Sequence, residues 1–362
     1  MIEKEKLSFC SIIFLFVLFI PFIANIFCSN VEILDNRPLY KKPTKLSLNY
    51  SKDFELYYND HIIWRKWFIR KYKSINKRVS TKLNNFINGK NGWMFYNSLY
   101  LYFGESRYNK TQLEFLLKIF NDVQTYYDKK EIKYIAFIAS NKENIYPEFM
   151  EDKFIKNRVS NYSKNDVAVE FLKNNGINFF SIKDELLRSK NIYNNLLYYK
   201  KDTHWNDIGA FIGYIQLLKE LRKIDKTIVE DIVLNKNMIK ENGVFSPDMD
   251  LMTKEIMYKI DYKPNIITKN IFNSNNGKIL EYYTENAKYD KTILCFRDSF
   301  MGSIIPYMVK DFKRTIFLLE RVKSIDELEK LIIKYKPDIV IDEAVERSFD
   351  TFFRYDNIYG NK

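Results

Sequence analysis

Two short segments of this sequence contain the residue types that nucleophilic catalysis requires. KKDTHWNDIGAF places Asp202 and His204 just before a predicted helix, and TILCFRDSFMGS places Ser299 between a predicted strand and the next helix. A serine hydroxyl is a weak nucleophile until a base accepts its proton, and histidine is the base suited to neutral pH. A carboxylate fixes the imidazole tautomer. The three residues therefore predict a Ser-His-Asp triad.

Each of these residues also has a structural interpretation. A serine before a helix most often caps it, and Asp202 could cap the helix that begins near Asn206. The chain has only two histidines, and His61 lies in an amphipathic segment where we expect a surface or packing role. Because the other histidine follows an aspartate at a helix entrance, the catalytic interpretation is favoured.

Further residues could line the predicted site. Asn141 and Lys142 follow an apolar strand and could face the pocket, although a solvated loop would hold the same residues. Trp205 could stack on a sugar ring or belong to the core. Arg347 follows the last strand and could hold an anionic substrate group by a bidentate contact, or form an ion pair with Glu346 or Asp342.

The elements that position these residues indicate an α/β fold. Three runs of near-continuous apolar character fit strands that are buried on both faces of a parallel sheet: YIAFIAS at 134–140, TILCF at 292–296 and DIVIDEA at 338–344. Helical patterns alternate with them, which predicts a mainly parallel sheet with helices on both faces. We expect these three strands to be neighbours, with the chemistry at their carboxyl ends. Residues 229–290 look like a β-rich insertion.

The N-terminal segment predicts a membrane anchor. Leu7 to Cys28 carries no charge and is long enough to span a bilayer, which takes ~20 apolar residues. Lys4 and Lys6 precede it, so the positive-inside rule places the rest of the chain outside the cytoplasm. A cleaved signal peptide is the alternative. The predicted domains are an anchor at 1–30, a lead-in region at 31–108 that packs on the core, and the α/β domain at 109–362.

Charge and cysteine content narrow the function classes. The net charge of +12 favours anionic partners such as membrane headgroups or acidic glycans, but no Arg-rich block is present, so nucleic acid is not expected. The three cysteines form no CxxC pair, which argues against a zinc knuckle or a disulfide framework. Cys295 is the only thiol after the predicted anchor. We expect neither a metal nor another cofactor.

The motifs together resemble the AlgX/AlgJ-type SGNH hydrolase-like family, the alginate and exopolysaccharide O-acetylation proteins. The motifs that carry this resemblance occur in the family's order: DNRPL at 35–39, DFELYYNDHIIWR at 53–65, NGKNGWMFY at 88–96, SNKENIYPEF at 140–149, DTHWND at 202–207, RDSF at 297–300 and KPDIVIDEAVER at 336–347. The Asp-His pair precedes the serine, which is the reverse of ordinary SGNH hydrolases. The resemblance therefore implies an SGNH-like (flavodoxin-like) fold with a circularly permuted motif order.

The resemblance also implies a function. Ser299 would carry an acyl group, usually acetyl, His204 would act as base and then acid, and Asp202 would orient His204. The acceptor would be a polysaccharide outside the cytoplasmic membrane, and a multi-spanning membrane acyltransferase would supply the acyl group. This sequence departs from the family pattern in having Arg297 where relatives often have glycine, which affects the oxyanion-hole geometry, and Ser140 where many have proline.

Two other functions fit the same residues. A carbohydrate esterase or deacetylase would use the same triad, with water instead of a sugar hydroxyl reaching the acyl-serine. A non-catalytic glycan-binding scaffold would keep the fold without needing the triad. The joint presence of Asp202, His204 and Ser299 argues against the scaffold.

Overall fold

The computed structural model divides the chain into two compact units, residues 1–84 and 85–362. The residues that it describes are 19, 40–44, 50–61, 85–193, 195–229, 231–245, 254–263, 266–274 and 277–360. In the first unit they include helix α2 (Tyr50–His61), where the Asp60 carboxylate accepts a hydrogen bond from the Tyr40 N–H at 3.0 Å. Among the described residues, no helix is long and apolar enough to cross a bilayer. The predicted anchor lies outside them apart from Phe19.

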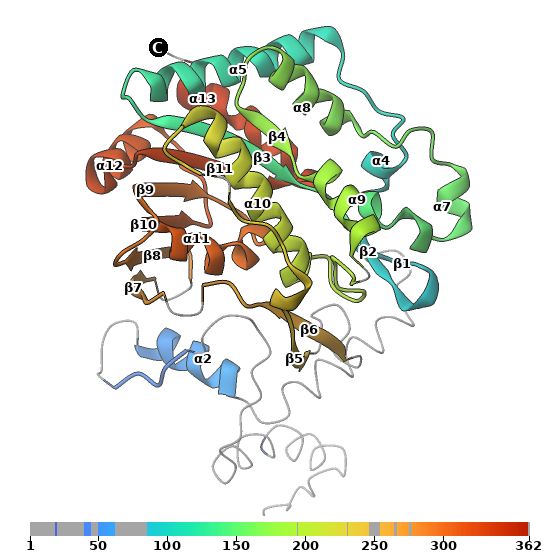
Figure 1. The fold of residues 1–362 in the computed structure, drawn as a ribbon, viewed down its shortest axis with the longest axis horizontal. Helices are drawn as coiled ribbons and strands as arrows, with labels where there is room; N and C mark the ends of the chain where they lie inside the picture. The colour runs from blue at the N-terminus through green and yellow to red at the C-terminus, as the bar shows by residue number, and fades with distance from the viewer. Residues whose placement is uncertain are drawn as a thin grey trace, which may run out of the picture. The chain divides into compact units, whose positions relative to one another are not determined.

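A mixed seven-stranded sheet forms the centre of the second unit (Figure 1). Its order is β4-β3-β11-β9-β10-β8-β7, and the first five strands are parallel to one another. The bounds are β3 Lys133–Ala139, β4 Phe179–Ser181, β7 Thr268–Asn273, β8 Ile279–Thr284, β9 Tyr289–Phe296, β10 Phe312–Leu318 and β11 Ile339–Val345. The three apolar runs are β3, β11 and β9, and they are neighbours as predicted.

Helices cover both faces of this sheet and form two separate cores. Along β3, alternate residues serve the two cores: Phe137 packs into one and Ala136 into the other. The first core contains residues of α9 (Lys183–Ile192), α10 (Asp207–Ile224) and α11 (Ile305–Asp311). The second contains residues of α5 (Lys110–Asp128), α8 (Lys164–Asn174), α12 (Ile325–Tyr335), η5 (Glu346–Tyr355) and α13 (Asp356–Tyr359). Every residue of β11 is buried, as in a strand that is covered on both faces of a sheet.

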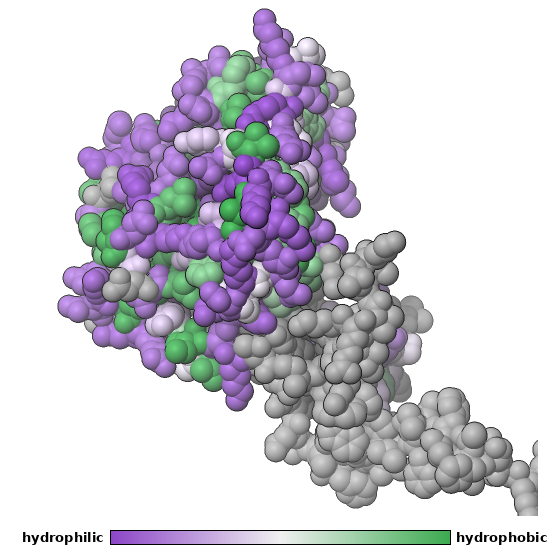
Figure 2. Space-filling model, turned by 90° about the vertical axis from the view of Figure 1, so that its right-hand side faces the viewer, coloured by the Kyte–Doolittle hydropathy of each residue, from purple (hydrophilic) through white to green (hydrophobic). Residues whose placement is uncertain are grey.

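Short elements before and between these layers complete the second unit, which begins at Asn85, within the predicted lead-in region. They are β1 Phe86–Asn88, η1 Lys90–Gly92, β2 Met94–Tyr96, α4 Leu99–Tyr102, α6 Lys142–Ile145, η2 Pro147–Phe149, α7 Asp152–Lys156, η3 Lys236–Met238 and η4 Phe300–Ser303. Trp93, just before β2, is buried in the first core. On the face that Figure 2 shows, hydrophilic residues predominate and hydrophobic ones lie between them.

The insertion predicted at 229–290 is smaller than expected. β5 (Ile239–Phe245) and β6 (Glu255–Ile260) form a separate antiparallel sheet, but β7 and β8 extend the main sheet and run antiparallel to their neighbours. The reason is that strands near the edge of a sheet are only partly buried. Their mixed sequences, such as ILEYYT in β8, do not distinguish an edge strand from an independent hairpin.

Because β3 is buried on both faces, shortening one of its side chains should lower the free energy of unfolding strongly. Phe137 is fully buried, so Phe137→Ala should lower the free energy of unfolding by about 3–5 kcal/mol. Val159 is 70% exposed, and Val159→Ala should change the free energy of unfolding by less than about 0.5 kcal/mol. Urea unfolding followed by circular dichroism measures both values. Equal effects of the two substitutions would contradict this burial of β3.

Candidate active site

The structure brings the three predicted triad residues together. His204 Nδ1 lies 2.6 Å from Asp202 Oδ1, and His204 Nε2 lies 2.8 Å from Ser299 Oγ. With the Nδ1 proton donated to the carboxylate, Nε2 is free to accept the serine proton, as a general base must. Asp202 is buried, whereas the His204 side chain is 32% exposed. The arrangement can therefore activate a serine nucleophile that substrate can reach.

The Asp202 carboxylate is held in its ionised form. Burial alone would raise its pKa, but the hydrogen bonds and positive charge of His204 outweigh burial and lower the pKa below its ordinary value. Asp202 Oδ1 also accepts a hydrogen bond from the His204 backbone N–H at 2.8 Å. One carboxylate oxygen thus fixes both the backbone and the ring of the histidine.

The loop before α10 folds back on itself and positions His204. The Asn206 N–H donates to the Leu197 carbonyl at 2.9 Å, and the Tyr199 N–H donates to the His204 carbonyl at 3.3 Å. Asn206 Oδ1 caps α10 by accepting from the N–H groups of Ile208 and Gly209. Because Asn206 caps the helix, Asp202 is not needed for that role and serves the histidine.

Gly209 lets α10 begin this close to the loop. A Cβ atom at this position would lie 2.3 Å from the Leu197 carbonyl oxygen, a distance that a side chain cannot adopt without a backbone shift. The glycine of DTHWND-x-GA is therefore a packing requirement of the site.

Ser299 does not act as a helix cap. It precedes η4, a four-residue 3₁₀ turn, and its side chain makes no capping hydrogen bond. The helix predicted after Ser299 is this turn followed by α11, because Pro306 cannot donate a backbone hydrogen bond and favours a new helix start. The turn is too short to have a sizeable helix dipole, so a dipole adds little to oxyanion stabilisation beside Ser299.

Asp298 positions the nucleophile, a role that sequence reasoning missed. Its Oδ1 accepts from the Phe300 N–H at 2.8 Å, and its Oδ2 accepts from the Val345 N–H at 2.6 Å. Its own N–H donates to Glu343 Oε2 at 2.9 Å. Asp298 therefore ties the serine turn to the end of β11. The only sequence signal was an aspartate directly before the serine.

Trp205 belongs to the core. Its ring is fully buried, and its Nε1–H donates to the Phe300 carbonyl at 2.9 Å. The Trp205 and Phe300 rings meet edge to face with centroids 5.3 Å apart. The expectation that Trp205 could stack on a sugar ring therefore does not fit its position. Trp205 instead links the start of α10 to the turn that follows Ser299.

Arg347 and Asn141 lie together beside the triad. The Arg347 guanidinium lies 5.3 Å from the Phe300 ring centroid, and the Phe300 ring is 4.9 Å from the His204 ring. Arg347 Nη1 donates to Asn141 Oδ1 at 3.2 Å. Asp342, one of its predicted ion-pair partners, is bound by Arg321 instead. A half-buried cation therefore stands next to the nucleophile turn.

Lys142 and Arg297 point to other partners. The Lys142 ammonium donates to three backbone carbonyls of the loop that carries Asp202. The Arg297 guanidinium is largely buried and donates to the carbonyls of Asp298 and Gly277, the latter near the start of β8. The bulk that Arg297 adds is thus accommodated toward the edge of the sheet, and the geometry gives no support to an oxyanion role for it.

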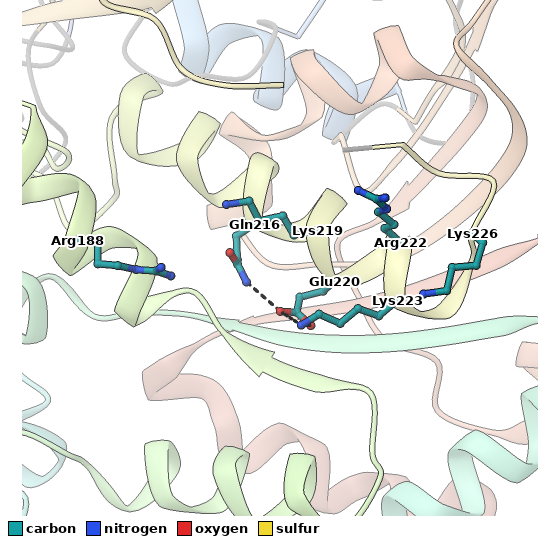
Figure 3. A pocket seen from close by; sticks show the side chains of 7 residues that line it. All are labelled: Arg188, Gln216, Lys219, Glu220, Arg222, Lys223 and Lys226. Carbon is teal, nitrogen blue, oxygen red and sulfur yellow. Dashed lines mark hydrogen bonds and ion pairs between the residues drawn. The ribbon is translucent and has the colours of Figure 1, made fainter. Parts of the chain in front are cut away.

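A surface pocket of about 420 Å³ lies apart from the triad, between α9 and the C-terminal half of α10 (Figure 3). Its lining is mostly cationic: Arg188, Gln216, Lys219, Glu220, Arg222, Lys223 and Lys226. Glu220 accepts hydrogen bonds from Gln216 and Lys223 within it. No triad residue lines this pocket.

Comparison with known proteins agrees with the motifs. Residues 86–242 match the family model described as "SGNH hydrolase-like domain, acetyltransferase AlgX". Residues 86–242 therefore resemble an AlgX-type SGNH hydrolase-like domain. The matched segment contains Asp202 and His204 but ends before Ser299, which the fold brings to the histidine. The predicted resemblance to the AlgX/AlgJ-type family is therefore confirmed. No curated protein sequence matches the chain.

Solved structures were also compared with this chain, and the two of Bacillus cereus PatB1 share its fold. Bacillus cereus PatB1 is 15% identical, with a TM-score of 0.54 over 73% of this chain and 96% of PatB1. A structure of Bacillus cereus PatB1 with a sulfonyl adduct has a TM-score of 0.52 at the same identity and coverage. The O-acetyltransferase domain of Pseudomonas putida AlgJ is 12% identical over 75% of this chain and 98% of its own length, with a TM-score of 0.44. At these identities the likeness to PatB1 concerns the fold.

The hydrogen bond between Asp202 and His204 predicts how fast Ser299 reacts. Asp202→Asn removes the charge that stabilises the imidazolium and favours the wrong imidazole tautomer, so sulfonylation by an aryl sulfonyl fluoride should slow on the order of 10³-fold. Mass spectrometry of the labelled peptide measures the rate. Asp184→Asn, at an exposed position of α9, is the control and should react like the native chain. Equal rates in both variants would exclude a role for the Asp202 charge.

Proposed function

We propose that this chain is an extracytoplasmic O-acyltransferase that transfers acyl groups, acetyl in the simplest case, to a cell-surface or exported polysaccharide through an acyl-Ser299 intermediate. The observation that supports this most strongly is His204, which contacts Asp202 on one side and Ser299 on the other. The family comparison supports the proposal too, because residues 86–242 match the model of an SGNH hydrolase-like acetyltransferase domain.

In the first half-reaction, Ser299 receives the acyl group. His204 Nε2 accepts the Ser299 proton while Oγ attacks the acyl carbonyl carbon, and a new Oγ–C bond forms. His204 then returns the proton to the donor oxygen as the bond between the carbonyl carbon and that oxygen breaks. Asp202 stabilises the imidazolium that exists between these steps.

In the second half-reaction, the acyl group leaves the serine. His204 accepts a proton from a sugar hydroxyl, whose oxygen attacks the acyl-serine carbonyl carbon. The Oγ–C bond breaks, and Ser299 regains its proton from His204. The products are an O-acylated sugar and the free enzyme, so each donor acyl group is consumed once per cycle.

Arg347 is the cation best placed to assist these steps. It lies against the Phe300 ring next to the nucleophile and gives one contact to Asn141. A guanidinium has five N–H donors, so others remain for the developing oxyanion or for an anionic substituent of the substrate. Asn141 would orient Arg347 within the site.

The cellular setting of this proposal rests on the N-terminal sequence. The uncharged stretch from Leu7 to Cys28 would anchor the chain in the cytoplasmic membrane, with the catalytic domain on the outer face. A multi-spanning membrane acyltransferase would then donate the acyl group, and the net charge of +12 would favour the anionic membrane surface.

A carbohydrate esterase is the second candidate, and one observation favours it. The His204 side chain is 32% exposed and its contact with Ser299 lies at the surface. Water can therefore reach an acyl-serine in the absence of a bound sugar. The same triad would then release free acid, and the outcome would depend on whether acceptor or water occupies the space beside His204.

A serine substitution tests the proposed chemistry. Ser299→Ala in the full chain should lower the release of p-nitrophenol from p-nitrophenyl acetate at least about 10³-fold, because the nucleophile is lost. It should also remove the acetyl adduct that intact mass spectrometry detects on the native protein. The unfolding free energy should change by less than about 0.5 kcal/mol, because the hydroxyl caps no helix.

Ser303→Ala is the matched control, because Ser303 ends the same 3₁₀ turn and should keep native activity. Full activity of Ser299→Ala would refute the acyl-serine mechanism. Adding acetylated and unacetylated oligosaccharides then separates the two functions. Acetyl groups appearing on the acceptor support the transferase, whereas free acetate at an unchanged rate supports the esterase.

A further inference from the structure

The loop that carries Asp202 is held from α6 by one buried lysine. Lys142 Nζ donates to the carbonyl oxygens of Tyr199 at 2.9 Å, Lys200 at 3.0 Å and Asp202 at 2.6 Å. An ammonium group has three N–H donors, and these three carbonyls use all of them. Lys142 therefore has no donor left for a substrate, which separates it from the role that its position after β3 suggests.

The surroundings of Lys142 stabilise its hydrogen bonds to the loop. The residue is 2% exposed, and its Nζ lies 5.4 Å from the Trp93 ring centroid and 5.1 Å from that of Phe95. Cation–π attraction and the three carbonyl dipoles stabilise a charge that water does not reach. Burying a lysine in this way is costly unless it is fully hydrogen-bonded, so the loop and the lysine depend on each other.

Two other elements, β2 and β6, also bind this loop. The Glu255 carboxylate, at the start of β6, accepts hydrogen bonds from the N–H groups of Lys200 and Lys201. The Met94 N–H, at the start of β2, donates to the Lys200 carbonyl at 2.9 Å. Backbone donors and acceptors of the loop are thus fixed from α6, β2 and β6 together. This leaves little freedom for Asp202 to move.

We propose that Lys142 is a positioning residue: by binding the Asp202 carbonyl it sets the direction of the Asp202 carboxylate and so the alignment of His204 with Ser299. The carbonyl and the carboxylate belong to one residue, and Asp202 Oδ1 contacts both the N–H and the ring of His204. A displacement of the Asp202 backbone would therefore move both contacts. Only the activity measurements below rest on the proposed function.

The charge of Lys142 makes its hydrogen bonds to the loop depend on pH. Burial lowers the pKa of Lys142 to about 7, while the carboxylates of Asp202 on the loop, Glu255 on β6 and Glu143 on α6 oppose this and Lys201 on the loop adds to it. Loss of the proton leaves two N–H donors for three carbonyls. Activity should therefore fall as pH rises from about 7 to 9, whereas the stability contribution of Lys142 should rise over that range, because the unfolded chain binds the extra proton.

Lys142→Met tests the proposal. It keeps the length of the side chain but donates no hydrogen bond, so kcat/KM for p-nitrophenyl acetate should fall about 100-fold, as for a catalytic group displaced by about 1 Å. The loss should lie in kcat, with KM within about twofold of the native value. In an Asp202→Asn background the same substitution should cost less than about threefold, because residues that act as a unit are not additive.

Lys190→Met is the matched control. Lys190 Nζ also donates to a backbone carbonyl, that of Ile145 at 2.7 Å, and also lies over an aromatic ring, that of Tyr146, but it does not contact the catalytic loop. Its kcat/KM should stay within about twofold of native. The alkaline fall in activity should persist in Lys190→Met and disappear in Lys142→Met. Equal kinetics and equal pH profiles in the two variants would overturn the proposal.

A spectroscopic measurement keeps the proposal independent of turnover. Because the chain has two histidines, ¹⁵N-histidine NMR should give one strongly deshielded Nδ1 proton, from the His204–Asp202 contact, in the native chain and in Lys190→Met. Lys142→Met should lose or broaden it. If the native chain gives this signal but neither transfers nor hydrolyses acetyl groups, only the proposed function is refuted. An unchanged signal in Lys142→Met would refute the positioning role.

If Lys142→Met does not fold, Lys142→Arg replaces it. Arginine keeps the charge and the donors but presents them in a planar fork that fits three converging carbonyls poorly, so kcat should fall by about 10-fold with the melting temperature retained. A folded Lys142→Arg with native kcat and a native Nδ1 proton signal would also overturn the proposal.

Discussion

The site depends on one physical constraint: polar groups removed from water must find partners, and here those partners define the catalytic geometry. Asp202 is buried and ionised, so it must be hydrogen-bonded, and the groups that satisfy it are the ring and the backbone of His204. Lys142 is buried too, and the carbonyls that its Nζ binds belong to the loop that carries Asp202. The hydrogen bonds that satisfy these buried groups are thus the same ones that orient His204.

The same constraint links the nucleophile to the end of β11. Burial and the nearby charge of Asp298 raise the pKa of Glu343 well above its ordinary value, so this buried carboxyl group favours its neutral form. It nevertheless accepts the Asp298 N–H, and Asp298 in turn accepts the N–H groups of Phe300 and Val345. A conformational change in the serine turn would leave several of these buried groups without partners. The turn is therefore held even though η4 is only four residues long.

Sequence reasoning found the parts of this arrangement that depend on pattern. The apolar runs of β3, β9 and β11 indicate parallel strands, and their carboxyl ends place Asn141, Ser299 and Arg347 at one edge of the sheet. The scarcity of histidine singled out His204. Pattern could not assign Asp298 or Lys142, because their roles depend on backbone groups of other segments that no periodicity marks. Nor could it separate β7 and β8 from an insertion, because partly buried edge strands lack a continuous apolar signature.

The segment that matches the AlgX family and the segment after it make different contributions to the site. Residues 86–242 supply Asp202, His204, Lys142 and the Trp93 ring, which together form the base and its support. The later segment supplies Ser299 and, from β6, Glu255. β6 is also bound to the start of α10, because the Ile260 N–H donates to Asp207 Oδ2 at 2.8 Å. The small β5–β6 sheet thus contacts both ends of the segment that carries His204. Because β6 binds both the loop before His204 and the start of α10, its residues Glu255 and Ile260 serve the support of the base as well as the pairing of β6 with β5.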